Sequence, residues 1–139
     1  MNLVELAKVI FTGDKGTIII QDRTGHSKIG EKLGFFGGGI KQDETPEQAL
    51  RRELLEELRY SPEILNFFIK QNTICKITGK FYGWKVIEHI FLSPITPELL
   101  GSPCLEGGGI KELLLADALK LPDFWEGDHK ILEILYEKD

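Results

Sequence analysis

Residues 37 to 60 read GGGIKQDETPEQALRRELLEELRY, and this stretch combines a helix start with an unusual concentration of charge. Thr45 is a candidate N-cap, and Pro46 suits the first helical position. Gln48 follows Thr45 by three residues, as in a capping box, where the two side chains satisfy each other's backbone N–H groups. The pattern predicts a helix from about residue 46 to residue 59.

The same helix carries three glutamates beside a leucine stripe. Glu53, Glu56 and Glu57 have the spacing i, i+3 and i+4, so their carboxylates project from one face. The stripe that should pack on a sheet consists of Leu50, Leu54 and Leu58. Crowded carboxylates repel one another unless a cation neutralises them, and Mg²⁺ and Mn²⁺ prefer oxygen ligands. A solvated helix face with Arg–Glu pairs is the alternative interpretation.

Composition bounds the whole chain. Its 139 residues suggest one domain over 1–139, and 42% hydrophobic with 28% charged residues is typical of a soluble globular protein. The formal charge of -5 argues against general binding to a nucleic-acid polymer, which needs concentrated positive charge. The N-terminal residues have no cationic leader and no long apolar run, so we expect no membrane segment and a cytoplasmic location. Cys75 and Cys104 lack metal-ligand spacing and are expected to be reduced thiols.

The rest of the N-terminal two-thirds alternates between strand and turn patterns. Residues 3–12 and 17–23 are rich in strand formers and flank a GDKG turn, so they predict a β-hairpin. Glycines punctuate residues 24–39, which we expect to be mostly loop. Further strands are predicted over 63–78, as one bent strand or two, and over 83–92.

The C-terminal third mixes loop, strand and helix signals. Proline and glycine mark residues 93–109 as a long surface loop. Residues 110–116 predict a strand that leads into a short helix near 116–120, and residues 128–139 have apolar residues at helical spacing. Strands with a few interspersed helices predict an α/β (α+β) fold, in which helices cover a mixed sheet.

The charged stretch resembles the Nudix box, G-x5-E-x7-R-E-U-x-E-E-x-G-U, in which U is a bulky apolar residue. Five residues separate Gly38 from Glu44, and seven more precede Arg52 and Glu53. The match covers 23 residues with many fixed positions, so it is a specific signal. The predicted hairpin before it and the strands after it also resemble a compact MutT-like Nudix domain, which implies an α/β/α sandwich.

Two positions depart from the family pattern. Arg59 stands where the box has glycine, a residue that suits a left-handed helix end, so the pattern leaves the end of this helix open, with another cap at Arg59 as one option. Phe36 stands where many members have proline before the paired glycines. Either the glycine loop is more mobile here, or Phe36 packs beneath it.

The resemblance implies a hydrolase that acts on a nucleoside diphosphate linked to a group X. Water would attack one phosphorus of the pyrophosphate bridge, giving a nucleoside monophosphate and phospho-X or pyrophosphate. Carried over by position, Glu53, Glu56 and Glu57 would bind Mg²⁺, or alternatively Mn²⁺. The carbonyl of Gly37 or Gly38 would be a further ligand.

Supporting roles follow from the same resemblance. Arg52 would orient a glutamate, and Glu44 would support the metal cluster through a second ion or a bound water. The general base is less fixed in this family. Glu53 or Glu56 within the box is one candidate, and Glu106, on a later loop beside flexible glycines, is another.

Substrate contacts are the last set of expectations. Relatives often place a basic residue near the substrate phosphate where Arg23 ends the second predicted strand, and Gly38 lies beside the same site. Phe35, Phe124 and Trp125 are candidates for stacking on a base, because an aromatic face accepts any base. Core packing is the alternative role for each of the three aromatic residues.

The box leaves the substrate open. A nucleoside triphosphate, an oxidised dNTP, or a nucleotide-sugar such as ADP-ribose would use the same metal site. Two other classes remain: a non-catalytic Nudix module that senses a nucleotide, and an isomerase of the same fold that uses a catalytic cysteine. A small-molecule nucleotide is the expected partner, and a homodimer is expected only by analogy with many relatives.

Overall fold

The computed structural model describes residues 2–23, 33–76, 79–103, 109–122, 124 and 126–138. Its strands are β1 (Leu3–Thr12), β2 (Thr17–Asp22), β3 (Leu33–Gly34), β4 (Phe36–Gly39), β5 (Asn66–Ile74), β6 (Lys85–Pro94) and β7 (Gly109–Leu114). Its helices are α1 (Pro46–Leu58), α2 (Pro97–Leu100), α3 (Leu115–Ala118) and α4 (Glu126–Lys138). None of the helices in these ranges is long and apolar enough to cross a membrane.

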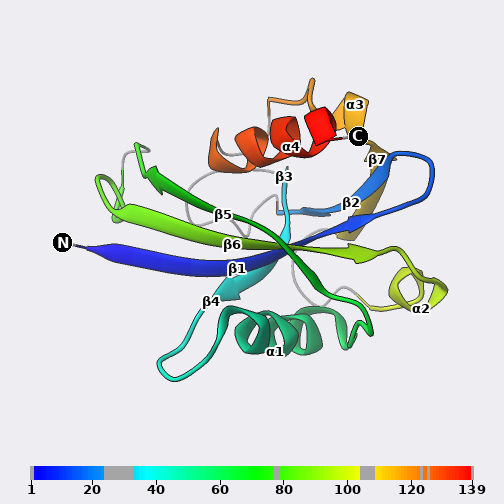
Figure 1. Cartoon of the computed structure of the whole chain (residues 1–139), viewed down its shortest axis with the longest axis horizontal. Coiled ribbons are helices and arrows are strands. Elements are labelled where there is room, and N and C mark those ends of the chain that lie inside the picture. Colours follow the sequence, from blue (N-terminus) through cyan, green and yellow to red (C-terminus); the bar gives the residue numbers. More distant parts are fainter. Residues whose placement is uncertain are drawn as a thin grey trace.

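A mixed sheet forms the middle layer, with α1 on one face and α3 and α4 on the other (Figure 1). The strand order is β3-β2-β1-β6-β5, and β4 pairs with β1 while β7 pairs with β2. β1 and β6 run parallel from the pair Leu3↔Lys85 to the pair Thr12↔Pro94. The other ladders are antiparallel. The predicted α/β/α arrangement with a mixed sheet is confirmed.

β1 is the central strand, because it pairs with three others. It bonds to β6 along one edge, while the opposite edge pairs first with β4, from Leu6↔Gly39 to Val9↔Phe36, and then with β2 at Phe11↔Ile19. Successive side chains of a strand point to opposite faces. Val9 therefore joins the core under α1, and Ile10 joins the core under α4.

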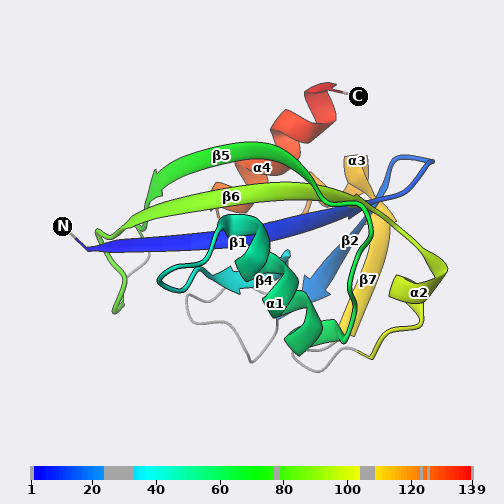
Figure 2. The same cartoon turned by 60° about the horizontal axis from the view of Figure 1, so that its bottom comes forward.

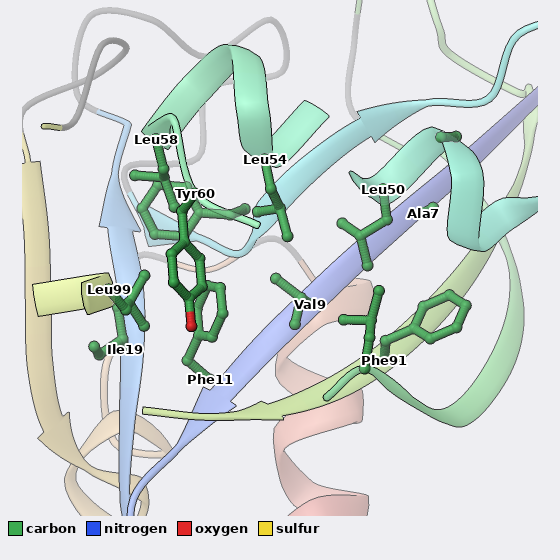
Figure 3. Packing of buried hydrophobic residues seen from close by; sticks show 13 residues of the cluster. Ala7, Val9, Phe11, Ile19, Leu50, Leu54, Leu58, Tyr60, Phe91 and Leu99 are labelled. Carbon is green, nitrogen blue, oxygen red and sulfur yellow. The ribbon is translucent and has the colours of Figure 1, made fainter. Parts of the chain in front are cut away.

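The leucine stripe anchors α1 to the sheet (Figure 3). Leu50, Leu54 and Leu58 are fully buried, and they share one cluster with the β1 residues Ala7, Val9 and Phe11. Burial of each leucine stabilises the fold by about 1.5–3 kcal/mol. The predicted capping box is also present: the Gln48 N–H donates to Thr45 Oγ1 (3.1 Å), and the Thr45 N–H donates to Gln48 Oε1 (2.9 Å).

The opposite core lies between the sheet and α4. Its members from α4 are Ile131, Leu132 and Leu135, and its members from the central strands include Ile10, Ile20 and Ile90. Phe35 and Phe124 belong to the same cluster, with their ring centroids 6.0 Å apart. Figure 2 shows α4 rising from the face of the sheet that lies opposite α1.

Two predicted loops contain regular structure. In the described part of 24–39, Leu33–Gly34 and Phe36–Gly39 form β3 and β4. These strands are short and glycine-rich, so their stability comes from their ladders to β2 and β1 rather than from local propensity. Within 93–109, Pro97–Leu100 forms α2, whose N-cap Thr96 accepts the Leu99 N–H (3.1 Å).

Several boundaries shift by a few residues. The segment predicted over 63–78 is one strand, β5, with a register irregularity between Phe67 and Ile69. The final strand ends at Leu114 and leads directly into α3, and α4 begins at Glu126 rather than at Asp128.

The structure shows how α1 ends, which the sequence pattern left open. Arg59 itself adopts the left-handed conformation (φ 51°, ψ 39°), and its N–H bonds back to the Leu55 carbonyl (3.0 Å). Glycine takes this conformation at lower cost, because a Cβ atom strains it. The helix therefore ends in the left-handed conformation that the family pattern favours, although this chain has arginine there instead of glycine.

Candidate active site

The glycine strand β4 brings the loop before α1 against β1. Gly37 has φ 144°, and a Cβ atom there would collide with the Ala7 carbonyl oxygen and the Lys8 Cα. Phe36, next to it, is fully buried and packs on Phe11, with ring centroids 6.3 Å apart. Of the two alternatives for Phe36, packing beneath the glycines is the one observed.

Gly38 is fitted to a carboxylate of α1. A Cβ atom at Gly38 would lie 2.5 Å from Glu53 Cδ and 2.6 Å from Glu53 Oε1, closer than atoms tolerate. The absence of a side chain at this position therefore allows the Glu53 carboxylate to approach the backbone of β4. The Glu53 carboxylate thus lies directly against the backbone of Gly38 in β4.

Arg52 ties the loop and the helix together. Its guanidinium grips Glu44 with two bonds, from Nε to Oε2 (2.8 Å) and from Nη2 to Oε1 (2.9 Å). It also donates from Nη1 to Glu53 Oε1 (2.9 Å) and from Nη2 to the Gly39 carbonyl (3.0 Å). Glu56, four residues on, is more distant at 3.6 Å. The planar fork of arginine suits such a bidentate contact, which also fixes orientation.

Electrostatics strengthens this contact. The Arg52 guanidinium and the Lys41 N–H, which donates to Glu44 Oε1 (2.9 Å), lower the pKa of Glu44 to about 2. The hydrogen bonds that Arg52 donates to Glu44 hold the pKa of Arg52 above its ordinary value, although partial burial opposes this shift. Both groups therefore stay charged over the whole neutral range.

The three glutamates of the box differ in depth. Glu57 is buried, the Glu53 side chain is 18% exposed, and the Glu56 side chain is 56% exposed. Over the ranges that the structure describes, no three Asp, Glu, His or Cys side chains converge as a ready-made metal cluster. The donors are nonetheless hard oxygen atoms of the type that Mg²⁺ prefers, and the hydrogen bond that Arg52 donates to Glu53 uses only Oε1 of that carboxylate.

The expected substrate residues have separate positions. Arg23 Nη1 donates to Gln21 Oε1 (2.9 Å), and its stem crosses Gly34, where a Cβ atom would lie 2.7 Å from Arg23 Cδ. Phe35 is 2% exposed in the core, so its ring is packed rather than open to a base. Glu106 and Trp125 lie outside the described residues.

A second charge cluster, on the α4 face, has no counterpart in the sequence predictions. Lys8 Nζ lies 2.7 Å from Glu88 Oε2 and 3.1 Å from Asp128 Oδ1. The side chains are 15%, 0% and 2% exposed for Lys8, Glu88 and Asp128 respectively. The signal for this cluster in the sequence is a charged residue within each of two apolar strands, Lys8 in β1 and Glu88 in β6.

Burial and pairing shift the titration of this cluster. Desolvation raises the pKa of Asp128, the Lys8 ammonium lowers it, and the Glu88 charge raises it again, to a net value of about 7. Burial lowers the pKa of Lys8, but the two carboxylates outweigh that effect and hold it above the ordinary lysine value. We refer to Lys8, Glu88 and Asp128 as the buried cluster, and to Glu44, Arg52 and Glu53 as the loop cluster.

Known proteins share this fold and sequence pattern. The family model described as NUDIX domain matches residues 5–134. The chain belongs to the NUDIX family. This NUDIX chain is 37% identical over 70 residues to an 8-oxo-dGTP diphosphatase of Escherichia coli (strain K12), a match that covers 50% of the chain and 54% of that protein.

Two further similarities extend the comparison. An RNA pyrophosphohydrolase of Marinomonas sp. (strain MWYL1) is 36% identical over 76 residues, covering 55% of this chain and 38% of that protein. A MutT protein from Methanosarcina mazei Go1 has a TM-score of 0.79 at 16% identity, covering 99% of this chain and 95% of that one. The NUDIX chain thus shares its fold along nearly all its length, while its sequence matches span about half of the first relative and less of the second.

Proposed function

We propose that this NUDIX domain is a Mg²⁺-dependent pyrophosphohydrolase that cleaves a nucleoside diphosphate linked to X. The observation that supports this most directly is the loop cluster, in which Arg52 holds Glu44, Glu53 and the Gly39 carbonyl together. A purely solvated helix face would not need Gly38 to fit against the Glu53 carboxylate. The two sequence relatives are a nucleotide diphosphatase and an RNA pyrophosphohydrolase, which favours a phosphate anhydride as the bond that is cleaved.

The carboxylates of α1 would hold the cation. In this proposal Glu53, Glu56 and Glu57 are its side-chain ligands, with the carbonyl of Gly37 or Gly38 beside them and Glu44 in support. Mg²⁺, or Mn²⁺ in its place, would neutralise phosphate charge and make a bound water more acidic. Arg52 is a positioning residue, because it sets the distance between the glycine strand and Glu53.

The remaining roles concern the proton and the substrate. A carboxylate of the site would accept the proton of the attacking water, and Glu53, Glu56 and Glu106 are the candidates. Arg23 would contact a substrate phosphate. It directly follows the last residue of β2, and its aliphatic stem crosses Gly34. The substrate that we favour is a nucleoside triphosphate, including oxidised dNTPs, ahead of a nucleotide-sugar, because the E. coli relative is an 8-oxo-dGTP diphosphatase.

The test is a hydrolysis assay with matched variants of α1. Purified protein with Mg²⁺ is incubated with nucleoside triphosphates, 8-oxo-dGTP, ADP-ribose and nucleotide-sugars, and released pyrophosphate is distinguished from phosphate. Glu53→Gln and Glu57→Gln should each lower turnover by about 100-fold or more, since each removes a ligand charge with little change in shape.

The control for this assay is Glu47→Gln. Glu47 lies in the first turn of the same helix and pairs with Arg51 (3.1 Å), outside the loop cluster. Its loss should leave turnover unchanged. Equal turnover by wild type and Glu53→Gln would contradict the metal-ligand role. Metal-dependent nucleotide binding without any turnover would instead indicate a sensing module.

A further inference from the structure

Positive charge is distributed very unevenly along this acidic chain. Residues 64–87 contain four lysines and no aspartate or glutamate, although the chain as a whole has a formal charge of -5. The described residues of this range, 64–76 and 79–87, include β5, a turn at 79–83 and the beginning of β6. The whole-chain charge, which argues against nucleic-acid binding, averages over this basic hairpin.

The basic hairpin extends beyond the helices. In Figures 1 and 2 the connected ends of β5 and β6 reach past both α1 and α4, beside the N-terminus. Lys70, Lys76 and Lys80 are exposed, and Lys85 is partly exposed. β5 is also an edge strand, so its outer side is open to a partner. The cations of the hairpin therefore extend from the first turn of α4, where Lys76 lies, to the projecting turn that contains Lys80.

Aromatic rings are interleaved with these lysines. Tyr82 is 64% exposed, and the rings of Phe81 and Trp84 meet edge to face with centroids 4.9 Å apart. Lys80 Nζ lies 5.4 Å from the centre of the Phe81 ring. A ligand that carries both phosphates and planar bases is complementary to this combination of lysines and rings.

A cavity lies where the hairpin meets the first turn of α4. Its volume is about 240 Å³, and the cations Lys76 and Lys130 line it together with Asn72, Thr73 and a single carboxylate, Glu126. The cavity thus offers two cations, opposed by one carboxylate, at the base of the hairpin.

The hairpin and the candidate active site lie at the same end of the sheet. Gly39 of β4 is level with Leu6 of β1, Glu88 of β6 and Gln71 of β5. Lys85 is the first residue of β6 and lies three residues before Glu88, toward the turn of the hairpin. At a rise of roughly 3.3 Å per residue this is about 10 Å along the strands, a distance that a nucleotide or two spans.

We propose that the basic hairpin, residues 70–76 and 79–85, binds single-stranded nucleic acid, with its lysines on phosphates and the exposed ring of Tyr82 on an unpaired base. Membrane lipid is less suited to this surface, because lysines and polar side chains break up its exposed apolar residues. The proposal extends the partner from a free nucleotide to a polymer. It concerns binding alone, so it stands apart from the proposed hydrolysis.

The test is fluorescence anisotropy with an unstructured single-stranded RNA of about 12 nucleotides, and a DNA of the same length, in EDTA. EDTA removes the metal, so the result does not depend on hydrolysis. The variant with Lys70→Gln, Lys76→Gln and Lys80→Gln should bind at least about ten-fold more weakly than wild type at low salt. Its plot of log affinity against log salt should be shallower by about 2, since each phosphate contact contributes roughly 0.7.

The matched control changes three exposed lysines elsewhere, Lys15→Gln, Lys111→Gln and Lys120→Gln. It has the same net charge as the hairpin variant and should bind as wild type does. Equal loss by both variants would overturn the proposal, because net charge alone would then explain binding. Both variants should hydrolyse nucleoside triphosphates, if wild type does, at the wild-type rate.

Tyr82→Ala separates stacking from charge. It should weaken binding by about five-fold or more without changing the salt dependence, because stacking on a base is electrostatically neutral. Duplex RNA bound as tightly as single strands would overturn the proposal. Binding of anionic phospholipid vesicles without binding of either oligonucleotide would also overturn it and indicate a membrane surface.

Discussion

The loop cluster and the buried cluster occupy opposite faces of the same sheet and obey different rules. Residues 44 to 53 supply all of the loop cluster, and its side chains are 18–22% exposed. The buried cluster joins β1, β6 and α4, and two of its three side chains are at most 2% exposed. One arrangement follows from a short stretch of chain, while the other requires the whole fold.

This difference in depth separates two uses of charge. An ion pair that water can reach contributes little to stability, about 0–1 kcal/mol, so the loop cluster can exchange partners when a ligand arrives. A buried charge that loses its partner is strongly unfavourable, so the buried cluster fixes how α4 sits on the sheet. We therefore expect changes in the loop cluster to alter binding and changes in the buried cluster to alter folding.

The largest effect on stability should come from Lys8→Met. This change removes the cation from between Glu88 and Asp128, and should lower the free energy of unfolding by about 3–5 kcal/mol because two carboxylates remain buried. Urea denaturation measures it. Lys15→Met, at an exposed position in the turn after β1, is the control and should have almost no effect. A loss below about 1 kcal/mol for Lys8→Met would show that the buried cluster is not buried in solution.

The next effect is on metal affinity, through Arg52→Lys. Lysine lacks the fork that reaches Glu44, Glu53 and the Gly39 carbonyl together, so Mn²⁺ should bind about 10–100-fold more weakly. Electron paramagnetic resonance of free Mn²⁺ measures this without any activity assay. Arg51→Lys is the control, since Arg51 contacts Glu47 and the Pro62 carbonyl instead. If both variants lost affinity equally, the position of Arg52 would have no special role.

Stability should also depend on pH through Asp128. Its pKa of about 7 in the folded protein is above the ordinary value of 3.8, so the folded state holds a proton that the unfolded state releases. The contribution of Asp128 is therefore present at acid pH and is lost as pH rises through about 7. Asp128→Asn should flatten this part of the stability curve, measured by urea denaturation from about pH 4 to 8. An unchanged slope in the variant would assign the titration to another group.

The contribution of the loop cluster to stability should depend on pH in the opposite direction. The pKa of Glu44 is lowered to about 2 by Arg52, so its pairing is present above its ordinary pKa of 4.5 and is lost only as pH falls toward 2. Raising the pH to about 7 thus weakens the buried cluster, whereas lowering it toward 2 weakens the loop cluster. Asp128→Asn leaves the acid limb of the curve intact if the two clusters are independent.

The smallest effect should come from Arg59→Gly. Glycine takes the left-handed conformation observed at Arg59 without strain, so the substitution should stabilise the protein by about 0.5–1 kcal/mol. Arg59→Ala removes the same side chain but keeps the Cβ atom, and should give no gain. Differential scanning calorimetry of the two variants measures the difference. A gain for alanine equal to that for glycine would locate the effect in the arginine side chain.

How much of this could be predicted from sequence depends on the range of the interaction. The capping box of Thr45 and Gln48 and the stripe of Leu50, Leu54 and Leu58 act within a few residues, and all were predicted correctly. β4 was predicted as loop, because its glycines have low strand propensity and only its ladder to β1 makes it a strand. Long-range pairing overrides local preference there.

The candidate site likewise has a part that local sequence predicts and a part that depends on contacts between distant residues. Helical spacing puts Glu56 four residues after Arg52, within reach of an ion pair, whereas the fork of Arg52 turns toward Glu44 and Glu53. The direction of that fork depends on the loop before α1, which spacing along the helix does not describe. No local pattern brings the members of the buried cluster together, since 120 positions separate Lys8 from Asp128.

The parallel pairing of β1 with β6 has a consequence for how the chain folds as it is made. Leu3 pairs with Lys85, so the central strand leaves the ribosome long before its main partner exists. At the usual elongation rate of about 5–20 residues per second, β1 waits roughly 4–16 s for that partner. During this interval β2 and β4 are the strands that can cover its other edge. The glycine strand that positions the candidate active site is thus also one of the first segments with which the nascent central strand can pair.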